Sequence, residues 1–302
     1  MGILSRTWTL TKIRLVLATR NRAFFFFSLV MPLIFLVGAV IFIGNRRQWV
    51  AYILGSLLTT TVMGSFWGLS VQLVTFREQG ILRRFRIAPV GAGPLLASSI
   101  ISNYFMALPV VVLEVLVCRY LLHMPNWGNL PAILLLVTIG SATFSSLGLI
   151  VASVTNTMQE TQMINNLIWM GFIFLGGATI PISTFPSWLQ HLSLFIPAQY
   201  LATGLQSAAT WRATRWEMLE DSIALSLGMF VAFEMSRRLF RWEPEAKAPR
   251  RAKLWVLAAF VPFLMFGLWE NIHGAQLYRV KNNFQALRRM VPAQLDAPRG
   301  NP

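Results

Sequence analysis

Residues 76–90 read FREQGILRRFRIAPV, a short basic loop between two long apolar runs. Gly80 permits a sharp turn, because glycine accepts positive φ angles. After this turn, Ile81, Leu82 and Phe85 are predicted to present an apolar ridge with arginines beside it. A ridge of this kind fits a groove on a partner protein. The alternative is that the arginines only anchor the loop to anionic lipid.

The composition of the chain indicates a membrane protein. Of its 302 residues, 55% are hydrophobic and 12% are charged, whereas soluble domains carry about 25% charged residues. The formal net charge is +15, and the basic residues stand in short stretches beside apolar runs. This arrangement is typical of the cytoplasmic flanks of membrane helices. We therefore expect membrane lipid, and no nucleic acid, as a partner.

No catalytic or metal site is predicted. The single cysteine, Cys118, lies in an apolar run, and His123, His191 and His273 are isolated from one another. A disulfide, a metal-ligand set or a nucleophile–base pair would need closer groupings. The chain also lacks a Gly-x-x-x-x-Gly-Lys-Ser/Thr phosphate loop, so it is not expected to bind ATP by that route.

Apolar runs long enough to cross about 30 Å of hydrocarbon recur along the chain. The predicted spans are residues 23–43, 50–75, 94–121, 130–154, 162–180 and 222–240. Strand periodicity is absent, and helices satisfy their own backbone groups in lipid. The predicted fold class is therefore an all-α integral membrane protein with a core of six helices.

The two ends of the chain differ from this core. Residues 1–22 carry basic residues and no acid, which favours an amphipathic helix in the inner interface, or else a plain polar leader. Residues 254–269 form a candidate seventh span, although Pro262 could bend this run into a re-entrant hairpin. The predicted units are thus 1–22 (interfacial helix), 23–242 (transmembrane domain) and 243–302 (linker, candidate span and tail). The basic N-terminus and the basic loop 76–90 place the N-terminus in the cytoplasm.

A second informative stretch, residues 176–206, reads GGATIPISTFPSWLQHLSLFIPAQYLATGLQ. The glycines end the fifth span, and the prolines stop helix continuation. We expect Ser183 or Thr184 to cap a short helix that starts at Pro186. Trp188 and Tyr200 suit a membrane interface, so this outer loop is predicted to dip back into the outer leaflet. The alternative is an ordinary amphipathic loop.

Ionisable and polar residues inside the spans are candidates for a substrate path. Glu114 would contact a cation there, or it is an acid that is neutralised or reaches the outer surface. Hydroxyl and small residues of span 50–75 favour close helix packing, with a cavity lining as the alternative. The candidate path residues are Glu114, Thr60, Trp67, Asn165 and Asn166.

Both stretches resemble the permeases of the ABC-2 exporter family. In the first stretch the resemblance rests on the order acid, glycine, aliphatic, base, then Ala-Pro-Val, and it departs at Arg83, where many members carry an acid. The resemblance implies an ATPase-coupling loop comprising Arg77, Glu78, Gly80, Ile81, Leu82, Arg83, Arg84 and Phe85. It also implies external helices that cap the substrate path, with the motif residues Gly176, Gly177, Pro181, Pro186, Trp188, Leu189, Pro197 and Tyr200.

The resemblance further implies a function and a set of partners. The chain would be the permease subunit of an ATP-driven exporter in a bacterial-type inner membrane, and two copies would form the path as a homodimer. It would not be an enzyme itself, because a separate ABC ATPase subunit would bind ATP and Mg²⁺. The alternatives are a membrane-embedded enzyme that acts on lipid head groups and a secondary transporter.

Overall fold

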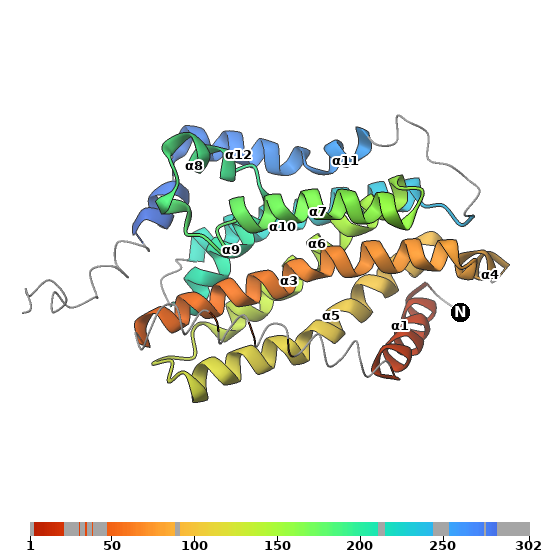
Figure 1. Ribbon diagram of the computed structural model, residues 1–302, viewed down its shortest axis with the longest axis horizontal. Coiled ribbons are helices and arrows are strands. Elements are labelled where there is room, and N and C mark those ends of the chain that lie inside the picture. The colour runs from red at the N-terminus through yellow and green to blue at the C-terminus, as the bar shows by residue number, and fades with distance from the viewer. Residues whose placement is uncertain are drawn as a thin grey trace, which may run out of the picture.

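The computed structural model describes residues 3–20, 30, 34, 38, 47–87, 91–210, 215–243, 254–274 and 276–282. Every regular element in these ranges is a helix (Figure 1), so the predicted all-α fold is confirmed. The predicted first span, residues 23–43, lies outside the described residues except for positions 30, 34 and 38.

Five long helices lie along the long axis of the molecule (Figure 1). They are α3 (Arg47–Glu78), α5 (Ala92–Leu116), α6 (Leu130–Val154), α7 (Met158–Leu175) and α10 (Arg215–Leu239). Helix α5 continues as a π-helical turn, Val117–Leu121. Within the described ranges, three segments are long and apolar enough to cross a membrane, namely Trp49–Glu78, Ala92–Leu121 and Leu130–Val154.

The fifth predicted span is displaced along the chain. Helix α7 begins at Met158 instead of residue 162, because Thr157 caps it by accepting a hydrogen bond from the Glu160 amide at 3.2 Å. It ends at Leu175 instead of residue 180, because Gly176 forms the C-cap and Gly177 adopts a φ of 72°. A left-handed residue of this kind stops an α-helix.

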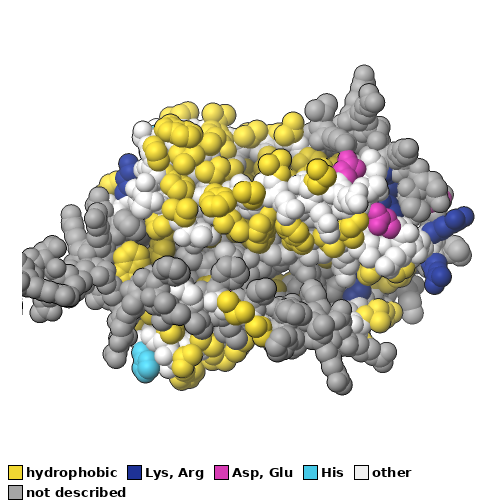
Figure 2. Space-filling model, viewed as in Figure 1, with side chains coloured by type: hydrophobic (Ala, Val, Ile, Leu, Met, Phe, Trp, Pro, Cys, Tyr) yellow, Lys and Arg dark blue, Asp and Glu magenta, His cyan; other side chains and the backbone are white. Residues whose placement is uncertain are grey.

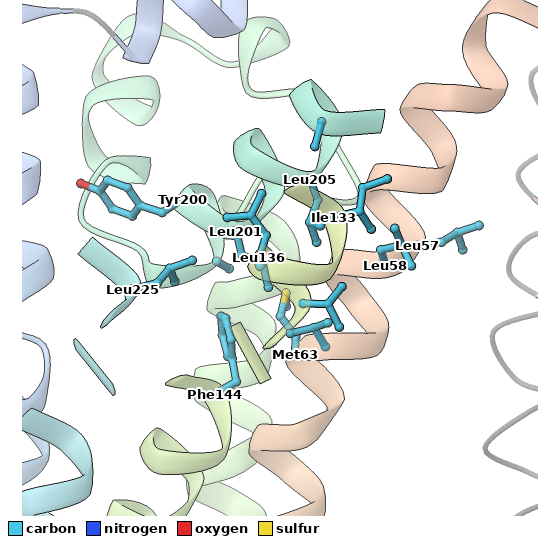
Figure 3. Close-up of a cluster of buried hydrophobic side chains, with 14 of the residues drawn as sticks. Leu57, Leu58, Met63, Ile133, Leu136, Phe144, Tyr200, Leu201, Leu205 and Leu225 are labelled. Atoms are coloured by element: carbon cyan, nitrogen blue, oxygen red, sulfur yellow. The ribbon is translucent and has the colours of Figure 1, made fainter. Parts of the chain in front are cut away.

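The hydrophobic core forms where α3, α6 and α10 meet α9 (Pro197–Ala209), a helix whose residues are all buried. Figure 3 shows leucines of these helices together with Met63 and Phe144 in this cluster. Glycines allow the close approach. A Cβ added at Gly148 would lie 2.2 Å from the carbonyl oxygen of Phe66, and one added at Gly55 would lie 2.5 Å from the Cα of Gln206. Close packing is thus one role of the small residues in α3.

Helix α1 (Ile3–Arg20) packs against α5 and lies at the same end of the molecule as the short helix α4 (Ile81–Ile87), as Figure 1 shows. The Arg14 side chain is partly buried, and its guanidinium lies 5.6 Å from the centre of the Phe76 ring. Burial lowers the pKa of Arg14 to about 10. On the face drawn in Figure 2, hydrophobic side chains cover the middle, while most of the Lys and Arg side chains gather near the end where α4 lies.

The candidate seventh span forms two helices, α11 (Leu254–Ala259) and α12 (Val261–His273), joined at Phe260. They follow one another nearly in line beside α10 (Figure 1). Pro262 lies in the first turn of α12, where its missing N–H has little cost. Within the described residues, this region is therefore a broken helix and not a hairpin. Its crossing of a membrane stays a prediction.

Candidate functional site

The basic loop begins with the predicted turn. Gly80 has a φ of 67°, and its amide donates to the carbonyl oxygen of Arg77 at 3.0 Å. Helix α4 starts at the next residue and forms one end of the molecule (Figure 1). The turn thus presents a separate short helix immediately after α3.

The predicted apolar ridge of α4 is wrong for Leu82. This side chain is fully buried in a cluster with Leu73, Leu95 and Leu149, and Phe85 packs partly against the same cluster. The reason is that α4 folds back onto neighbouring parts of α3, α5 and α6, so its apolar side packs into the protein's own core. Of this loop, the exposed charged side chains that the structure describes are Glu78, Arg83 and Arg84.

Arg77 binds inside the protein. It is 2% exposed, and it donates to the carbonyl oxygens of Ala152 at 2.8 Å and Thr155 at 2.7 Å. These oxygens belong to the last turn and C-cap of α6, which lack partners within the helix. A positive charge is favourable at this end of a helix. Arg77 therefore joins α3 to α6 from a buried position, and its part in the predicted ATPase-coupling loop stays a prediction.

Arg241, after α10, reaches the same place. It donates to the carbonyl oxygens of Thr155 at 2.6 Å and Ser153 at 3.2 Å, and to Oδ1 of Asn156 at 3.1 Å. Its burial lowers its pKa. Glu78 binds the other end of the short segment between α6 and α7. Its carboxylate accepts a hydrogen bond from the Met158 amide, at the start of α7, at 2.7 Å. We call these contacts of Arg77, Arg241 and Glu78 the inner node.

Sequence reasoning missed the inner node. The segment 155–161 carries little charge, which gave no reason to expect that it receives two arginines. One local signal was present, since Thr157 and Glu160 have the spacing of a helix-capping box. No local pattern in the sequence indicates the contact between Arg241 and Asn156, because these two residues lie 85 positions apart.

At the opposite end of the long axis, the outer loop forms the 3-10 turn Ile182–Thr184, then α8 (Ser187–Ser193), then α9. The predicted short helix near Pro186 is confirmed. The predicted cap is wrong, because Pro186 itself occupies the N-cap position, while Ser183 and Thr184 belong to the preceding turn. Pro197 opens α9 at its first turn, a position that suits proline.

The aromatic residues of this loop differ in exposure. Trp188 is 67% exposed, as an interfacial residue would be. Tyr200 is 1% exposed and donates to the Leu194 carbonyl oxygen at 2.8 Å, so the prediction of an interfacial Tyr200 is wrong. Its hydroxyl satisfies a buried backbone group instead. Leu189 is intermediate in exposure, and so is Pro181.

Two buried glycines join the outer loop to the core. A Cβ at Gly176 would lie 2.5 Å from the Cβ of Ala198, so glycine allows α9 to approach the end of α7. The carbonyl oxygen of Gly177 accepts from Nε2 of Gln206 at 3.0 Å. These contacts fix the position where α7 gives way to the outer helices.

Two of the candidate path residues, Glu114 and Asn165, form hydrogen bonds with different residues of α3. Glu114 is 1% exposed and accepts a hydrogen bond from Thr61 at 2.6 Å. Asn165 is fully buried and donates to Ser70 at 2.6 Å.

Trp67 and Trp169 meet edge to face, with ring centres 6.2 Å apart. Thr60 bonds within its own helix, to the Leu57 carbonyl oxygen, and Asn166 is exposed. The structure therefore does not gather these five residues into one site, and a role in transport stays a prediction for each.

A family model described as "ABC-2 type transporter" matches residues 5–209. "Probable multidrug ABC transporter permease YbhS" of Escherichia coli K12 is 24% identical over 51% of this chain and 39% of its own length. "Linearmycin resistance permease protein LnrN" of Bacillus subtilis 168 is 24% identical over 48% of this chain and 37% of its own length.

"Inner membrane transport permease YhhJ" of Escherichia coli K12 is 22% identical over 53% of this chain and 43% of its own length. The chain thus spans about two-fifths of the length of the curated relatives it matches. The family match runs from α1 to the end of α9 and includes both the inner node at Arg77 and the outer loop. Because this match covers more than half of the chain, the protein belongs to the ABC-2 type transporter family, whose members are multi-pass membrane proteins.

Proposed function

We propose that this protein is the permease subunit of an ATP-driven exporter. Two copies form the substrate path as a homodimer in a bacterial-type inner membrane, with the N-terminus in the cytoplasm. A separate ABC ATPase subunit binds ATP and Mg²⁺ and docks on α4. The family match and the permease names of the relatives support the transport class.

The observation that carries the proposal is the position of α4. This helix stands at one end of the molecule (Figure 1), with Arg83 and Arg84 exposed and Leu82 anchored in the core. The arginines can pair with acidic groups on a partner, while the buried leucine fixes the helix to the membrane domain. A displacement of α4 by a bound ATPase would therefore be transmitted directly to α3 through the Gly80 turn.

The inner node extends this connection. Arg77 lies just before the turn, and it contacts α6, while Arg241 brings in the end of α10. Movement of α4 would thus bias the arrangement of several helices at once, as alternating access requires. The relatives named for multidrug transport and linearmycin resistance favour an amphipathic, drug-like or lipid-like cargo for this chain.

The test is co-purification. The chain is produced together with an ABC ATPase encoded beside its gene, extracted in mild detergent and isolated through a tag on the permease. We expect the ATPase to be retained, and its ATP hydrolysis to rise with an amphipathic compound. The matched variants are Arg83→Glu with Arg84→Glu, which should release the ATPase, and Arg237→Glu with Arg238→Glu, which changes two exposed arginines at the end of α10.

Two results would contradict the proposal. Retention of the ATPase at the wild-type level by the double Arg83/Arg84 variant would show that α4 is only a lipid anchor. Failure of the wild-type chain to retain the ATPase would remove the proposed coupling altogether.

A further inference from the structure

The segment after residue 253 lies beyond the part of the chain that matches the family model, yet it packs tightly against α10 and against the outer loop. The Phe263 ring of α12 lies over Gly228 of α10, where an added Cβ would come within 2.2 Å of the ring. Conversely, α12 supplies the glycine in a second contact. The Phe195 ring lies over Gly267 of α12, where an added Cβ would come within 2.5 Å of the ring. Each ring fits a site that only glycine leaves open.

The contact between α12 and α8 also has a polar component. Nδ1 of His191 in α8 lies 2.5 Å from Oδ1 of Asn271 in α12, and the two are hydrogen-bonded. Tyr200 of α9 contacts the rings of Phe263 and Phe266, with centres 6.2 and 6.3 Å apart. Helix α12 therefore covers both helices of the outer loop.

A buried ion pair holds the chain beyond α12. Gly274, with a φ of 67°, ends α12, and residues 276–282 form a further helical stretch. Nη1 of Arg279 donates to Oδ2 of Asp221 at 2.8 Å, and the two side chains are 5% and 0% exposed. Nε2 of Gln276 donates to the other oxygen of Asp221 at 2.8 Å. Both oxygens of this carboxylate thus bind the C-terminal segment.

A fully buried carboxylate is unfavourable unless it is paired. Asp221 stands near the start of α10, and Arg279 and Gln276 supply the partners described above. Loss of the C-terminal segment would therefore leave a buried charge without its cation. This energetic requirement makes the segment a fixed part of the outer end of the protein.

We infer that Asp221 and Arg279 are positioning residues for the outer loop, because their ion pair holds α12 in place and α12 in turn holds α8. The inference goes beyond the proposed function, since it concerns the folded chain alone and needs no ATPase. It assigns a role to a segment that the family match leaves uncovered. Opening of the outer loop would require α8 and α12 to move as one body.

The test measures the contact between α8 and α12 directly. Cysteines replace His191 and Asn271 in a Cys118→Ala background, and the full-length protein in detergent is treated with a short bifunctional thiol reagent. We expect efficient cross-linking, seen as a shift in gel mobility. Arg279→Gln, which leaves Asp221 buried without its cation, should lower the cross-linking by at least about fivefold.

The neutral pair separates positioning from general loss of fold. Asp221→Asn combined with Arg279→Gln removes both charges and keeps hydrogen-bonding groups, so it should restore most of the cross-linking. Arg238→Gln is the matched control, because it breaks an exposed ion pair with Glu234 and should change nothing. Size-exclusion chromatography reports on folding of each variant.

If Arg279→Gln does not give a monodisperse protein, Gln276→Leu replaces it, since this change removes one donor and keeps the ion pair; we then expect about a twofold fall in cross-linking. Wild-type cross-linking in the folded Arg279→Gln or Gln276→Leu variant would overturn the inference. A fall in the Arg279→Gln variant that the neutral pair does not reverse would also overturn it.

Discussion

Arg77 and Arg241 donate to the same atom, the carbonyl oxygen of Thr155, at 2.7 and 2.6 Å. Arg77 lies in the last turn of α3 and Arg241 follows α10, so this shared acceptor brings two distant helices to the C-terminus of α6. The dipole and the free carbonyl groups of a helix end favour positive charge there. Arg77 also takes part in the turn that leads into α4, because its carbonyl oxygen accepts from the Gly80 amide at 3.0 Å.

The inner node is expected to stabilise the protein. Arg77→Ala removes two charge-assisted hydrogen bonds from a buried site and should lower the free energy of unfolding by about 2–4 kcal/mol. Thermal unfolding of the detergent-solubilised protein measures this loss. Arg238→Ala, which removes an exposed ion pair, should cost under about 0.5 kcal/mol. Equal melting temperatures for the two variants would show that Arg77 contributes little.

The turn at Gly80 is expected to be essential for the position of α4. Its φ of 67° strains a β-branched residue, and a left-handed conformation costs an ordinary residue about 1–2 kcal/mol. Gly80→Val should therefore weaken ATPase retention and transport, whereas Gly80→Asn should preserve both, because asparagine tolerates this conformation. The measurements are co-purification and export from cells. Full activity of Gly80→Val would mean that α4 needs no such turn.

Replacement of glycine by alanine is expected to destabilise the protein at a closely packed position and not at an open one. Gly148→Ala forces a methyl group against the Phe66 carbonyl group and should cost about 1–3 kcal/mol. Gly64→Ala places its methyl group in open space, so it should be neutral or stabilising by up to about 1 kcal/mol through helix propensity. Thermal unfolding again provides the comparison. A larger loss for Gly64→Ala would indicate that a second chain covers this face of α3.

Labelling can place α8 relative to the membrane. In a Cys118→Ala background, a cysteine at the exposed Ser187 should react with an impermeant thiol reagent much faster than one at Ser193, which is fully buried. Intact cells are used, so that only residues on the outside are labelled. Labelling of Ser187→Cys only after permeabilisation would place the outer loop on the cytoplasmic side.

The C-terminal tail is expected outside the cytoplasm, which would make the broken helix α11–α12 a seventh span. The C-terminal end of α12 contacts α8, at the end of the molecule opposite to α4 (Figure 1). A C-terminal alkaline phosphatase fusion should therefore be active, and a green fluorescent fusion should be dark. The reverse pattern would place the tail in the cytoplasm and reduce the core to six spans.

The sequence by itself determined the features that depend on local physical chemistry. Hydrophobic runs long enough to cross the hydrocarbon core of a bilayer predicted helices, and α6 has the predicted bounds because its apolar run is flanked by clear ends. Gly80 and Pro186 marked a turn and a helix start, since their backbone preferences act within one or two residues. The resemblance of two short motifs was sufficient to indicate the family.

Only the tertiary structure decided which side chains are available to a partner. Leu82, Arg77 and Tyr200 look like surface residues in the sequence, yet each is buried because a distant segment packs on it. The pairing of Asp221 with Arg279 joins residues 58 positions apart. Helical periodicity describes the faces of one helix, and it carries no information on which other helix covers a given face. The three-dimensional packing therefore assigned Arg77 and Asp221 to internal contacts and left Arg83 and Arg84 exposed.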